Sequence, residues 1–392
     1  MMLEPKTHTC SHPRKINMEH TRQRARTAVR RILGLMALLS MTACSTLGGM
    51  QSTASKPQYL YAANAGDNTI SAYRINAITG SLAPVAGSPF AAGNVAGSIT
   101  VNPAGTFAYV MDYFGGTISA YRIHASTGAL TPVPGSPFST GYQASRMVIN
   151  PAGTFAYVAS SYSNTVAAYR IDAATGALTP IPGSPFPTKS EAFSVTIDPA
   201  GSFAYVAGGN IGRISVFSID AATGALSPVK GSPFDSESVG HPISINSTGT
   251  FAYVAGANVS GDYGVTVYRV HAATGALTQV AGSPFAVTDR LAAAASVVIS
   301  PSGTFAYTVG DTISAYRINL STGALTPVAG SLPAYLSSLV INPTGSFVYQ
   351  GTGGGSAVAA FSINPNTGAL TPVPGSPFAA GANPAYLAIA QP

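Results

Sequence analysis

Residues 98–138, SITVNPAGTFAYVMDYFGGTISAYRIHASTGALTPVPGSPF, decide the fold because close variants of this stretch occur seven times in the sequence. The stretch divides at its turns into SITVN, FAYVM, TISAYRI and LTPVPGSPF. Each segment is rich in Val, Ile, Thr, Tyr or Phe and is bounded by Gly, Pro, Asn or Ser, which is typical of β-strands and their turns. One repeat therefore predicts four strands, here called a, b, c and d.

The period of the repeat predicts a β-propeller. A Thr-Gly turn separates strands c and d, and the seven glycines of these turns are 48, 48, 48, 51, 48 and 45 residues apart. A period in the forties made of short strands is typical of propeller blades. These glycines are Gly80, Gly128, Gly176, Gly224, Gly275, Gly323 and Gly368.

The two ends of the repeat array are incomplete in complementary ways. Residues 58–63 align with strand b and have no strand a before them, whereas Pro384–Ala390 align with strand a and have no other strand after them. Pairing these segments in one blade closes the ring and removes its open edges. The sequence thus predicts, over residues 57–392, an all-β seven-bladed propeller with four-stranded antiparallel blades.

A leader precedes the propeller. Five arginines between positions 22 and 31 are followed by an apolar run over residues 32–43, which is too short to span a bilayer but typical of a signal peptide. The run ends in Met41-Thr42-Ala43-Cys44, which is similar to a bacterial lipobox. We therefore expect residues 1–44 to contain a signal peptide and Cys44 to be lipidated. A simple secretory signal cut nearby is the alternative, and Met18 is an alternative start.

The leader also sets the expected location and charge. Residues 45–56 are small and polar and predict a flexible tether, so we expect an exported, membrane-anchored lipoprotein on the periplasmic or extracellular face, at the outer membrane if the cell has one. Of 19 Lys and Arg residues, eight lie at or before Arg31, and after Cys44 there are 11 basic and 11 acidic residues. A near-neutral mature chain argues against nucleic acid as a partner.

Metal and cofactor chemistry has no sequence support. Beyond Cys44 the mature chain has no cysteine, so a thiolate metal site is excluded. The chain also lacks a nucleophile elbow, a zinc-protease motif, a phosphate loop and an Asp-rich calcium loop. We expect no metal and no cofactor.

Loop length separates the two faces of the predicted ring. In a propeller, the a to b and c to d turns lie on one face and the other two connections lie on the opposite face. The a to b and c to d turns have the same length in every blade, whereas every insertion and deletion falls in the b to c and d to a connections. Variable loops on a rigid frame usually carry binding and catalysis, which places the candidate site on that face. Neutral drift in unconstrained loops is the alternative.

Charged residues divide into those that repeat and those that break the repeat. An arginine recurs at one strand c position in five blades, which predicts a structural role that each blade uses alike. Arg146, Glu191, His241 and Arg290 instead lie in or just before a strand a, where most blades carry Ala, Ser or Gly. Because innermost strands converge on the central channel, these four side chains are expected to gather at its mouth.

Three segments together resemble a known family: YAANAGDNTISAYRI at residues 61–75, the N/D-P-x-G-x-F-x-Y-V turn and strand, and TGALTPV. They are similar to the lactonase-type seven-bladed propellers, which include bacterial 6-phosphogluconolactonase and carboxymuconate cyclase, and to the related YVTN-repeat surface proteins. The resemblance covers essentially the whole mature chain. Lactonase members often begin a strand a with His-Pro-His; His241 and Pro242 match this pattern, and Ile243 replaces the second histidine.

Two functions follow as expectations. The first, which the leader and the YVTN-like repetition favour, is a lipid-anchored envelope module that binds a glycan, a small-molecule lactone or an envelope protein. The alternative is a lactonase, a carboxylic ester hydrolase, in which His241 is the base, Glu191 orients it, and Arg146 and Arg290 bind an anionic substrate. Whether the protein is an enzyme is left open. A closed pocket that gathers those four residues would favour the enzyme, whereas a shallow surface lined by Tyr113, Tyr162 and Tyr263 would favour the binding module.

Overall fold

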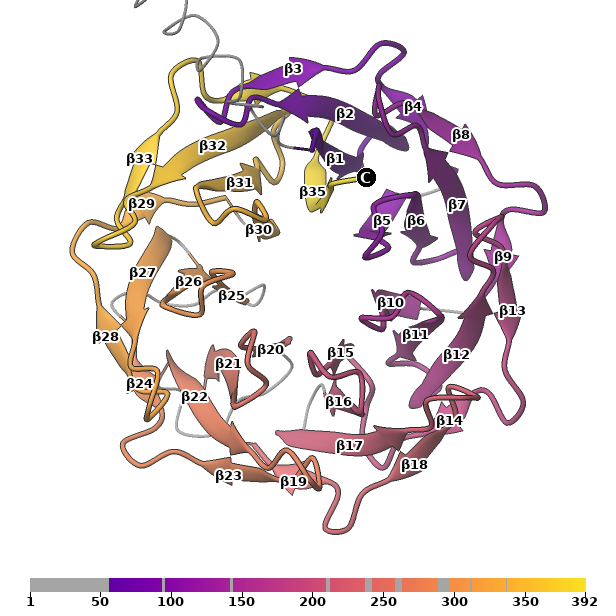
Figure 1. Ribbon diagram of the computed structural model, residues 1–392, viewed down its shortest axis with the longest axis vertical. Helices are drawn as coiled ribbons and strands as arrows, with labels where there is room; N and C mark the ends of the chain where they lie inside the picture. The colour runs from indigo at the N-terminus through magenta and orange to yellow at the C-terminus, as the bar shows by residue number, and fades with distance from the viewer. Residues whose placement is uncertain are drawn as a thin grey trace, which may run out of the picture. The chain divides into compact units, whose positions relative to one another are not determined.

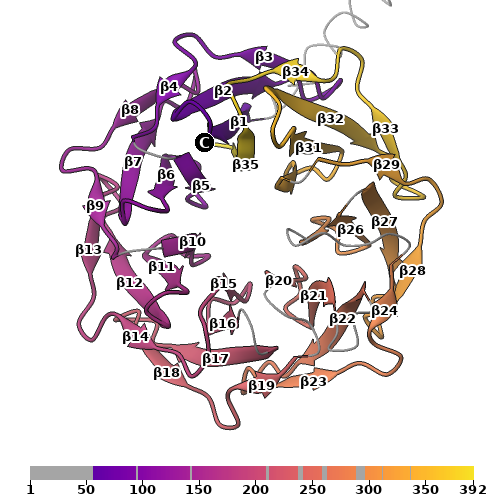
Figure 2. The ribbon, with the colours of Figure 1, turned by 180° about the vertical axis from the view of Figure 1, so that it is seen from behind.

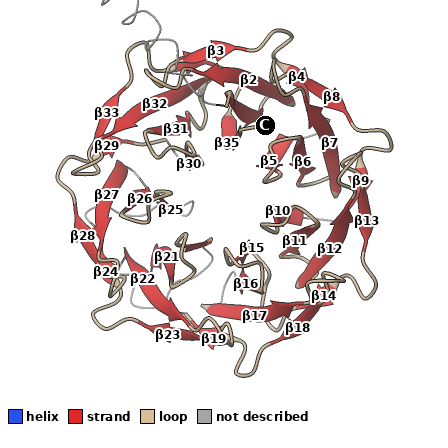
Figure 3. Cartoon of the chain, viewed as in Figure 1, coloured by secondary structure: helices blue, strands red, loops and turns tan. Residues whose placement is uncertain are grey.

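The computed structural model describes residues 56–93, 96–141, 144–208, 212–236, 242–257, 263–287, 296–310, 312–335 and 337–392. In these ranges the chain forms seven sheets arranged as blades around a central axis (Figures 1 and 2). Figure 3 shows strands joined by turns and loops, and no helix occurs in the described ranges. The predicted seven-bladed β-propeller is confirmed.

Each blade has its strands in the order a, b, c, d from the axis outward, and all neighbours are antiparallel. The innermost strands, a, are β35 (Pro384–Ala390), β5 (Ala96–Val101), β10 (Ala144–Ile149), β15 (Ser194–Ile197), β20 (Ile243–Ile245), β25 (Val297–Ile299) and β30 (Leu339–Ile341). Strands b are β1 (Gln58–Asn64), β6 (Phe107–Asp112), β11 (Phe155–Ser160), β16 (Phe203–Ala207), β21 (Phe251–Ala257), β26 (Phe305–Val309) and β31 (Phe347–Gly351). Strands c are β2 (Thr69–Ile75), β7 (Thr117–Ile123), β12 (Thr165–Ile171), β17 (Arg213–Ile219), β22 (Tyr263–Val270), β27 (Thr312–Ile318) and β32 (Ala357–Ile363). We number the blades I to VII from the one that contains β1.

The outermost strand differs from its prediction as one continuous segment, because each blade forms it in two pieces that both pair with strand c. In blade II, prolines in residues 130–138 lack the N–H that a ladder needs, and Gly135 turns the chain between the pieces with φ 83°. Ser136 fills the gap by accepting a hydrogen bond from the Ala120 N–H at 2.8 Å. The pieces are β3 (Leu82–Pro84), β4 (Phe90–Ala91), β8 (Leu130–Pro132), β9 (Phe138–Ser139), β13 (Leu178–Pro180), β14 (Phe186–Pro187), β18 (Leu226–Pro228), β19 (Phe234–Asp235), β23 (Leu277–Gln279), β24 (Phe285–Ala286), β28 (Leu325–Pro327), β29 (Leu332–Pro333), β33 (Leu370–Pro372) and β34 (Phe378–Ala379).

The ring closes in blade I by pairing the two ends of the array, as predicted. The last strand, β35, lies antiparallel to β1, and the C-terminus lies beside β1 and β5 near the axis (Figure 1). Two side chains of blade I hold the segment before β35: Ser71 Oγ accepts a hydrogen bond from the Gly381 N–H at 3.0 Å, and Asp67 Oδ2 accepts one from the Ala382 N–H at 2.9 Å. Closure therefore uses side-chain contacts in addition to the strand ladder.

The Thr-Gly glycine of each blade packs against the preceding blade. Gly176 has φ 79°, and a Cβ at this position would lie 2.4 Å from the ring of Phe107. Tyr109, on the same strand as Phe107, donates a hydrogen bond from its hydroxyl to the Gly176 carbonyl at 3.0 Å. An aromatic ring meets the glycine in this way at all seven junctions. Only glycine fits, because the backbone is left-handed and the ring leaves no room for a side chain.

The repeated arginines of strand c are structural, as their repetition predicted. The guanidinium of Arg170 lies 4.9 Å from the ring centroid of Phe155 and donates a hydrogen bond to the Ala222 carbonyl of the next blade at 3.1 Å. Arg122, Arg269 and Arg317 make the same pair of contacts. Each such arginine thus joins its own blade to the next.

The antiparallel order of the strands defines two faces. The a to b and c to d turns lie on one face, called here the turn face, and the b to c and d to a connections lie on the other, called the loop face. On the turn face an Asn or Asp side chain typically closes the a to b turn; Asn150 Oδ1, for example, accepts hydrogen bonds from the N–H groups of Thr154 and Phe155, both at 2.9 Å. These self-contained turns explain the constant length of that face.

Candidate functional site

The innermost strands of six blades line a cavity of about 310 Å³ on the propeller axis. Its wall comes from β10, β15, β20, β25, β30 and β35 and the residues next to them. Small and hydroxyl-bearing side chains dominate this wall, including Ser194, Thr196, Ser244 and Ser296. The strands leave a central space because their inner positions carry short side chains.

One position of strand a gives the cavity its chemical character. This position lies five residues before the first residue of the a to b turn, and in blade order it is occupied by Tyr386, Ser98, Arg146, Ser194, Pro242, Ser296 and Ser338. Serine occurs in four of the seven blades, so Arg146 and Tyr386 are the two large polar exceptions. Both line the cavity, and the Arg146 guanidinium lies 5.5 Å from the ring centroid of Tyr386.

The backbone of β10 presents Arg146 at an irregularity in the sheet. The register between β10 and β11 shifts between Ala144 and Arg146, which is a β-bulge at the loop-face end of the strand. Bulges bend a strand and re-aim side chains, and they are common beside functional sites. Arg146 is half-buried, and it is the only charged side chain among the described residues that line the cavity. The cavity therefore carries one positive charge that no described lining carboxylate balances.

The cavity hydroxyls fall into two groups. Thr196 Oγ1 donates to the Ile243 carbonyl at 2.6 Å, and Ser338 Oγ accepts from the Leu387 N–H at 2.8 Å, so these side chains join adjacent blades. Ser194 Oγ is fully buried and has no hydrogen-bond partner among the described residues, although Ser194 lines the cavity. Arg146 and Ser194 occupy the same position in adjacent blades and together can donate hydrogen bonds to an oxyanion.

The structure places only one of the four charged residues predicted for the site in the cavity. Arg146 lines it, whereas Glu191 is half-buried in the connection between β14 and β15 and is not among the lining residues. His241 and Arg290 lie outside the described residues, as does Cys44, although Pro242 directly after His241 lines the cavity. The predicted pairing of Glu191 with His241 is therefore untested.

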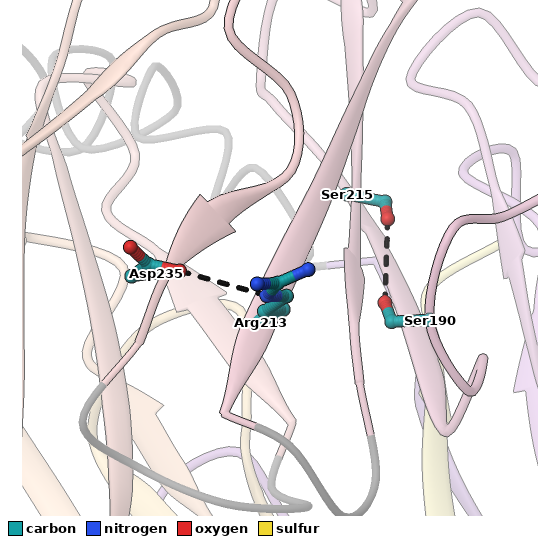
Figure 4. A network of polar contacts seen from close by, with 4 residues as sticks. All are labelled: Ser190, Arg213, Ser215 and Asp235. Atoms are coloured by element: carbon teal, nitrogen blue, oxygen red, sulfur yellow. Dashed lines mark hydrogen bonds and ion pairs between the residues drawn. The ribbon is translucent and has the colours of Figure 1, made fainter.

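Two polar contacts lie at the loop-face end of blade IV (Figure 4). Arg213 Nε lies 3.6 Å from Asp235 Oδ1, and the hydroxyls of Ser190 and Ser215 are 3.4 Å apart. The Arg213 and Asp235 side chains are 47% and 95% exposed, so their ion pair contributes little to stability. The ion pair joins β17 to β19, and the hydroxyl pair joins β17 to the connection between β14 and β15.

Aromatic side chains are also exposed on the loop face. Phe114 is 59% exposed, Tyr162 is 70% exposed and Tyr263 is 39% exposed, and all three belong to b to c connections or their ends. The ring of Tyr113 meets that of Phe114 edge-on, with centroids 5.0 Å apart. The described residues thus show a cavity that contains Arg146 and an exposed aromatic surface, but not the gathering of four charged residues that was expected to favour an enzyme.

Sequence reasoning missed Tyr386, Ser194, Ser296 and Ser338. An alignment of all seven strands a, including the closing strand, would have found them, because it shows that four blades carry serine at the Arg146 position. Charge alone marked Arg146, whereas Tyr386 is uncharged. Aligned positions are a better guide than charge in a ring of equivalent strands.

Two further observations bound the chemistry of the described part of the chain. No group of three or more His, Cys, Asp or Glu side chains gathers there in a way that could hold a metal ion. None of the described residues forms a helix long and apolar enough to cross a membrane.

Comparison with solved structures shows the fold again. A putative 6-phosphogluconolactonase from Bacteroides fragilis superposes with a TM-score of 0.72 at 20% identity, covering 86% of this chain and 99% of that one. The periplasmic gluconolactonase PpgL from Pseudomonas aeruginosa superposes with a TM-score of 0.71 at 16% identity, covering 86% of this chain and 100% of that one. At these identities the likeness concerns the fold. A search of curated proteins finds no significant match.

Comparison with protein families identifies the chain across its length. The family described as "Lactonase, 7-bladed beta-propeller" matches residues 52–138, 98–289 and 243–384. These overlapping matches follow the repeats from the first blade to the closing strand, and they agree with the resemblance found in the strand b and strand d segments. The chain belongs to the lactonase family of seven-bladed β-propellers.

Proposed function

We propose that this protein binds a small anionic ligand in the central cavity and that Arg146 holds the ligand's negative charge. The position of Arg146 carries the proposal: it is half-buried and lines a cavity in which no described side chain balances its charge. A guanidinium forms paired, charge-assisted hydrogen bonds with a carboxylate or phosphate, and these bonds gain strength away from bulk water.

The rest of the wall supports a polyhydroxylated ligand. Ser194 offers a hydroxyl without a described protein partner, Ser296 is a second hydroxyl on the wall, and Tyr386 offers an aromatic edge beside Arg146. A sugar acid or its lactone combines hydroxyls with a carboxylate or an ester carbonyl. The names of two fold neighbours, a periplasmic gluconolactonase and a putative 6-phosphogluconolactonase, point to the same ligand class.

Lactone hydrolysis is the second candidate, favoured by membership of the lactonase family. In this reaction water adds to the lactone carbonyl while a base takes one of its protons. The ring C–O bond of the tetrahedral intermediate then breaks, and the leaving oxygen takes up a proton to give the hydroxy acid. Arg146 would stabilise the oxyanion, His241 would be the base with Glu191 orienting it, and Arg290 would add positive charge.

Calorimetric titration with gluconate tests the binding proposal, with neutral glucose as the control ligand. We expect gluconate to bind and Arg146→Ala to weaken its binding by about a hundredfold, because a charge-assisted pair in a shielded site is lost. Arg170→Ala is the matched control: it removes an arginine that also lies over an aromatic ring, but outside the cavity. Gluconate that binds Arg146→Ala as tightly as the unchanged protein would contradict the proposal.

The enzyme candidate has a separate readout, which is acid release from gluconolactone. Turnover that is lost in His241→Ala while gluconate binding persists would establish hydrolysis at this cavity. Binding without turnover would leave the protein a ligand-binding module of lactonase-like fold.

We also propose that Cys44 anchors the protein to a membrane of the cell envelope, where the propeller meets small molecules, glycans or envelope proteins outside the cytoplasm. The lipobox-like end of the leader supports this location. Incorporation of labelled palmitate into the protein, and its loss in Cys44→Ala, is the expected result.

A further inference from the structure

We infer that the loop face carries a second binding surface, where Phe114 and Tyr162 stack on the pyranose rings of a neutral, β-linked polysaccharide. This inference goes beyond the cavity proposed above and needs neither Arg146 nor any catalytic group. It rests on the position, exposure and support of two aromatic side chains in neighbouring blades.

The two aromatic residues occupy the same place in consecutive blades. Phe114 lies in the turn between β6 and β7 of blade II, and Tyr162 lies in the turn between β11 and β12 of blade III. Each is five residues after the buried tyrosine of its strand b, a position that is Gly66 in blade I. Phe114 is 59% exposed and Tyr162 is 70% exposed. Neighbouring turns of equal length therefore present one ring each.

The turns that carry these rings are well supported. In blade II the Asp112 carboxylate accepts a hydrogen bond from the Gly115 N–H at 2.6 Å, and Tyr113 meets the Phe114 ring at an interplanar angle of 88°. In blade III the hydroxyls of Ser163 and Thr165 are 2.6 Å apart. A preformed surface of this kind loses little conformational entropy when a ligand binds.

Aromatic exposure is a property of the loop face in particular. Of the six large hydrophobic side chains that are exposed among the described residues, the four aromatic ones lie in loop-face connections or their ends: Phe114, Tyr162, Tyr263 and Tyr335. The other two, Ile78 and Leu320, are aliphatic and lie in turns of the turn face. General hydrophobic exposure would not sort ring and aliphatic side chains in this way.

The chemistry around the two rings matches a neutral sugar. The described residues of these two turns contain one charged group, Asp112, which is buried and already accepts a hydrogen bond. The other polar side chains belong to Ser, Thr, Asn and Tyr residues, whose hydroxyl and amide groups exchange hydrogen bonds with sugar hydroxyls. The flat C–H face of a β-linked pyranose packs on an aromatic ring without needing charge. A polyanion such as nucleic acid would instead need cations, and these turns supply none.

In blade III the aromatic surface lies at the same end of the sheet as the start of β10, the strand that carries Arg146. In blade III, Ser160 at the end of β11 pairs with Ala144 at the start of β10. Tyr162 lies two residues after Ser160 in the chain, and Arg146 lies two residues after Ala144. A polysaccharide on this surface would therefore lie on the face of the propeller from which the strand that carries Arg146 begins. Attachment to a polysaccharide would keep the cavity close to a source of carbohydrate.

Native affinity electrophoresis of the purified protein tests the inference, with laminarin and hydroxyethylcellulose as soluble, neutral β-glucan probes. We expect at least one probe to retain the protein. We also expect the double variant Phe114→Ala, Tyr162→Ala to bind it about tenfold more weakly, because two stacking contacts are lost. The matched control is Ile78→Ala, Leu320→Ala, which removes the exposed side chains of the turn face and should leave binding unchanged.

The outcomes separate this inference from the cavity proposal. Retention that persists in Arg146→Ala and is lost in the aromatic double variant supports the polysaccharide surface, whatever gluconate does. The inference is overturned if neither probe retains the protein, or if the aromatic and aliphatic double variants bind equally. Circular dichroism of each variant checks that the ring is intact.

Discussion

The turn face and the loop face both place an arginine over an aromatic ring, but the contact has a different role on each face. On the turn face, Arg170 stacks on Phe155 and donates to the carbonyl of Ala222, and three further blades repeat this arrangement. At the loop-face end of the channel, Arg146 stacks on Tyr386 once, at a position that other blades fill mainly with serine. Repetition around the ring marks a contact that holds blades together, whereas a single departure marks a group available to a ligand.

The comparison also explains why the turns on the turn face have a constant length in all blades. A turn-face glycine such as Gly176 is fixed by a ring of the previous blade, so any insertion there would separate two blades. Two loop-face glycines have open space instead: a Cβ built at Gly141 or Gly354 would meet nothing within 4 Å. At these two positions a side chain can be added without meeting a neighbouring blade, which no Thr-Gly turn of the turn face allows.

Alkaline pH gives the largest expected effect, because it acts on the packing between all blades at once. Burial raises the pKa of Tyr169 to about 12, and it raises the pKa of Tyr157, Tyr109 and their equivalents in the other strands b further. The unfolded chain ionises near pH 10, so stability is fully present below pH 10 and is lost as the pH rises through 12. Each such tyrosine removes about 1.4 kcal/mol per pH unit above its unfolded pKa.

Urea unfolding followed by circular dichroism between pH 8 and pH 12 measures this loss, and tyrosinate absorbance reports ionisation in parallel. Ionisation should coincide with unfolding. Complete tyrosine titration near pH 10 with an intact ring would show that the strand b tyrosines are accessible and would contradict the packing described here.

A glycine substitution on each face gives the next largest expected effect, which is a loss of unfolding free energy. Gly176→Ala must accommodate both a φ of 79° and a Cβ 2.4 Å from the Phe107 ring, and we expect a loss of about 3 kcal/mol or more of unfolding free energy. Gly354→Ala has a similar φ of 75° but open space, so it should cost about 1 kcal/mol. Equal losses in urea unfolding would mean that backbone conformation alone, and not the contact between blades, makes the turn-face glycine necessary.

An arginine substitution on each face gives the smallest expected difference in unfolding free energy. Arg170→Ala removes a cation–π contact and a hydrogen bond between blades, which should lower the unfolding free energy by about 1 to 2 kcal/mol and leave gluconate binding unchanged. Arg146→Ala should change the unfolding free energy by less than about 0.5 kcal/mol while it weakens gluconate binding by about a hundredfold. Thermal unfolding together with calorimetric titration measures both quantities. A stability loss in Arg146→Ala as large as that in Arg170→Ala would make Arg146 another structural arginine.

The fold could be predicted almost completely because each blade repeats the same local signals. The Thr-Gly spacing gave the number of blades, and the truncated ends gave the closing pair β1 and β35. The outermost strand was predicted as one piece, since period and composition do not show where prolines interrupt a ladder. Gly135 and Ser136 turn that segment into two short strands with a side-chain hydrogen bond between them.

The site was less predictable, because a cavity on the axis collects residues from strands that are far apart in the sequence. Arg146 stood out by charge, and the structure places it on the cavity wall. Tyr386 is 240 positions away and uncharged, and it became visible only when β35 was aligned with the other innermost strands. Glu191 was chosen by the same rule as Arg146, yet it does not line the cavity, because a position just before a strand can point away from the axis. The choice of His241 and Arg290 stays a prediction.

The closure between β1 and β35 has a consequence for how the chain reaches its native state. Every residue of β1 is buried in the finished ring, and its inner edge pairs with a strand that ends at Ala390. During synthesis from the N-terminus, β1 is made first, while its partner is the last strand of the ring to be made. Until then β1 has an open edge on which another chain could pair. The first blade can thus be completed only after all the others have been translated.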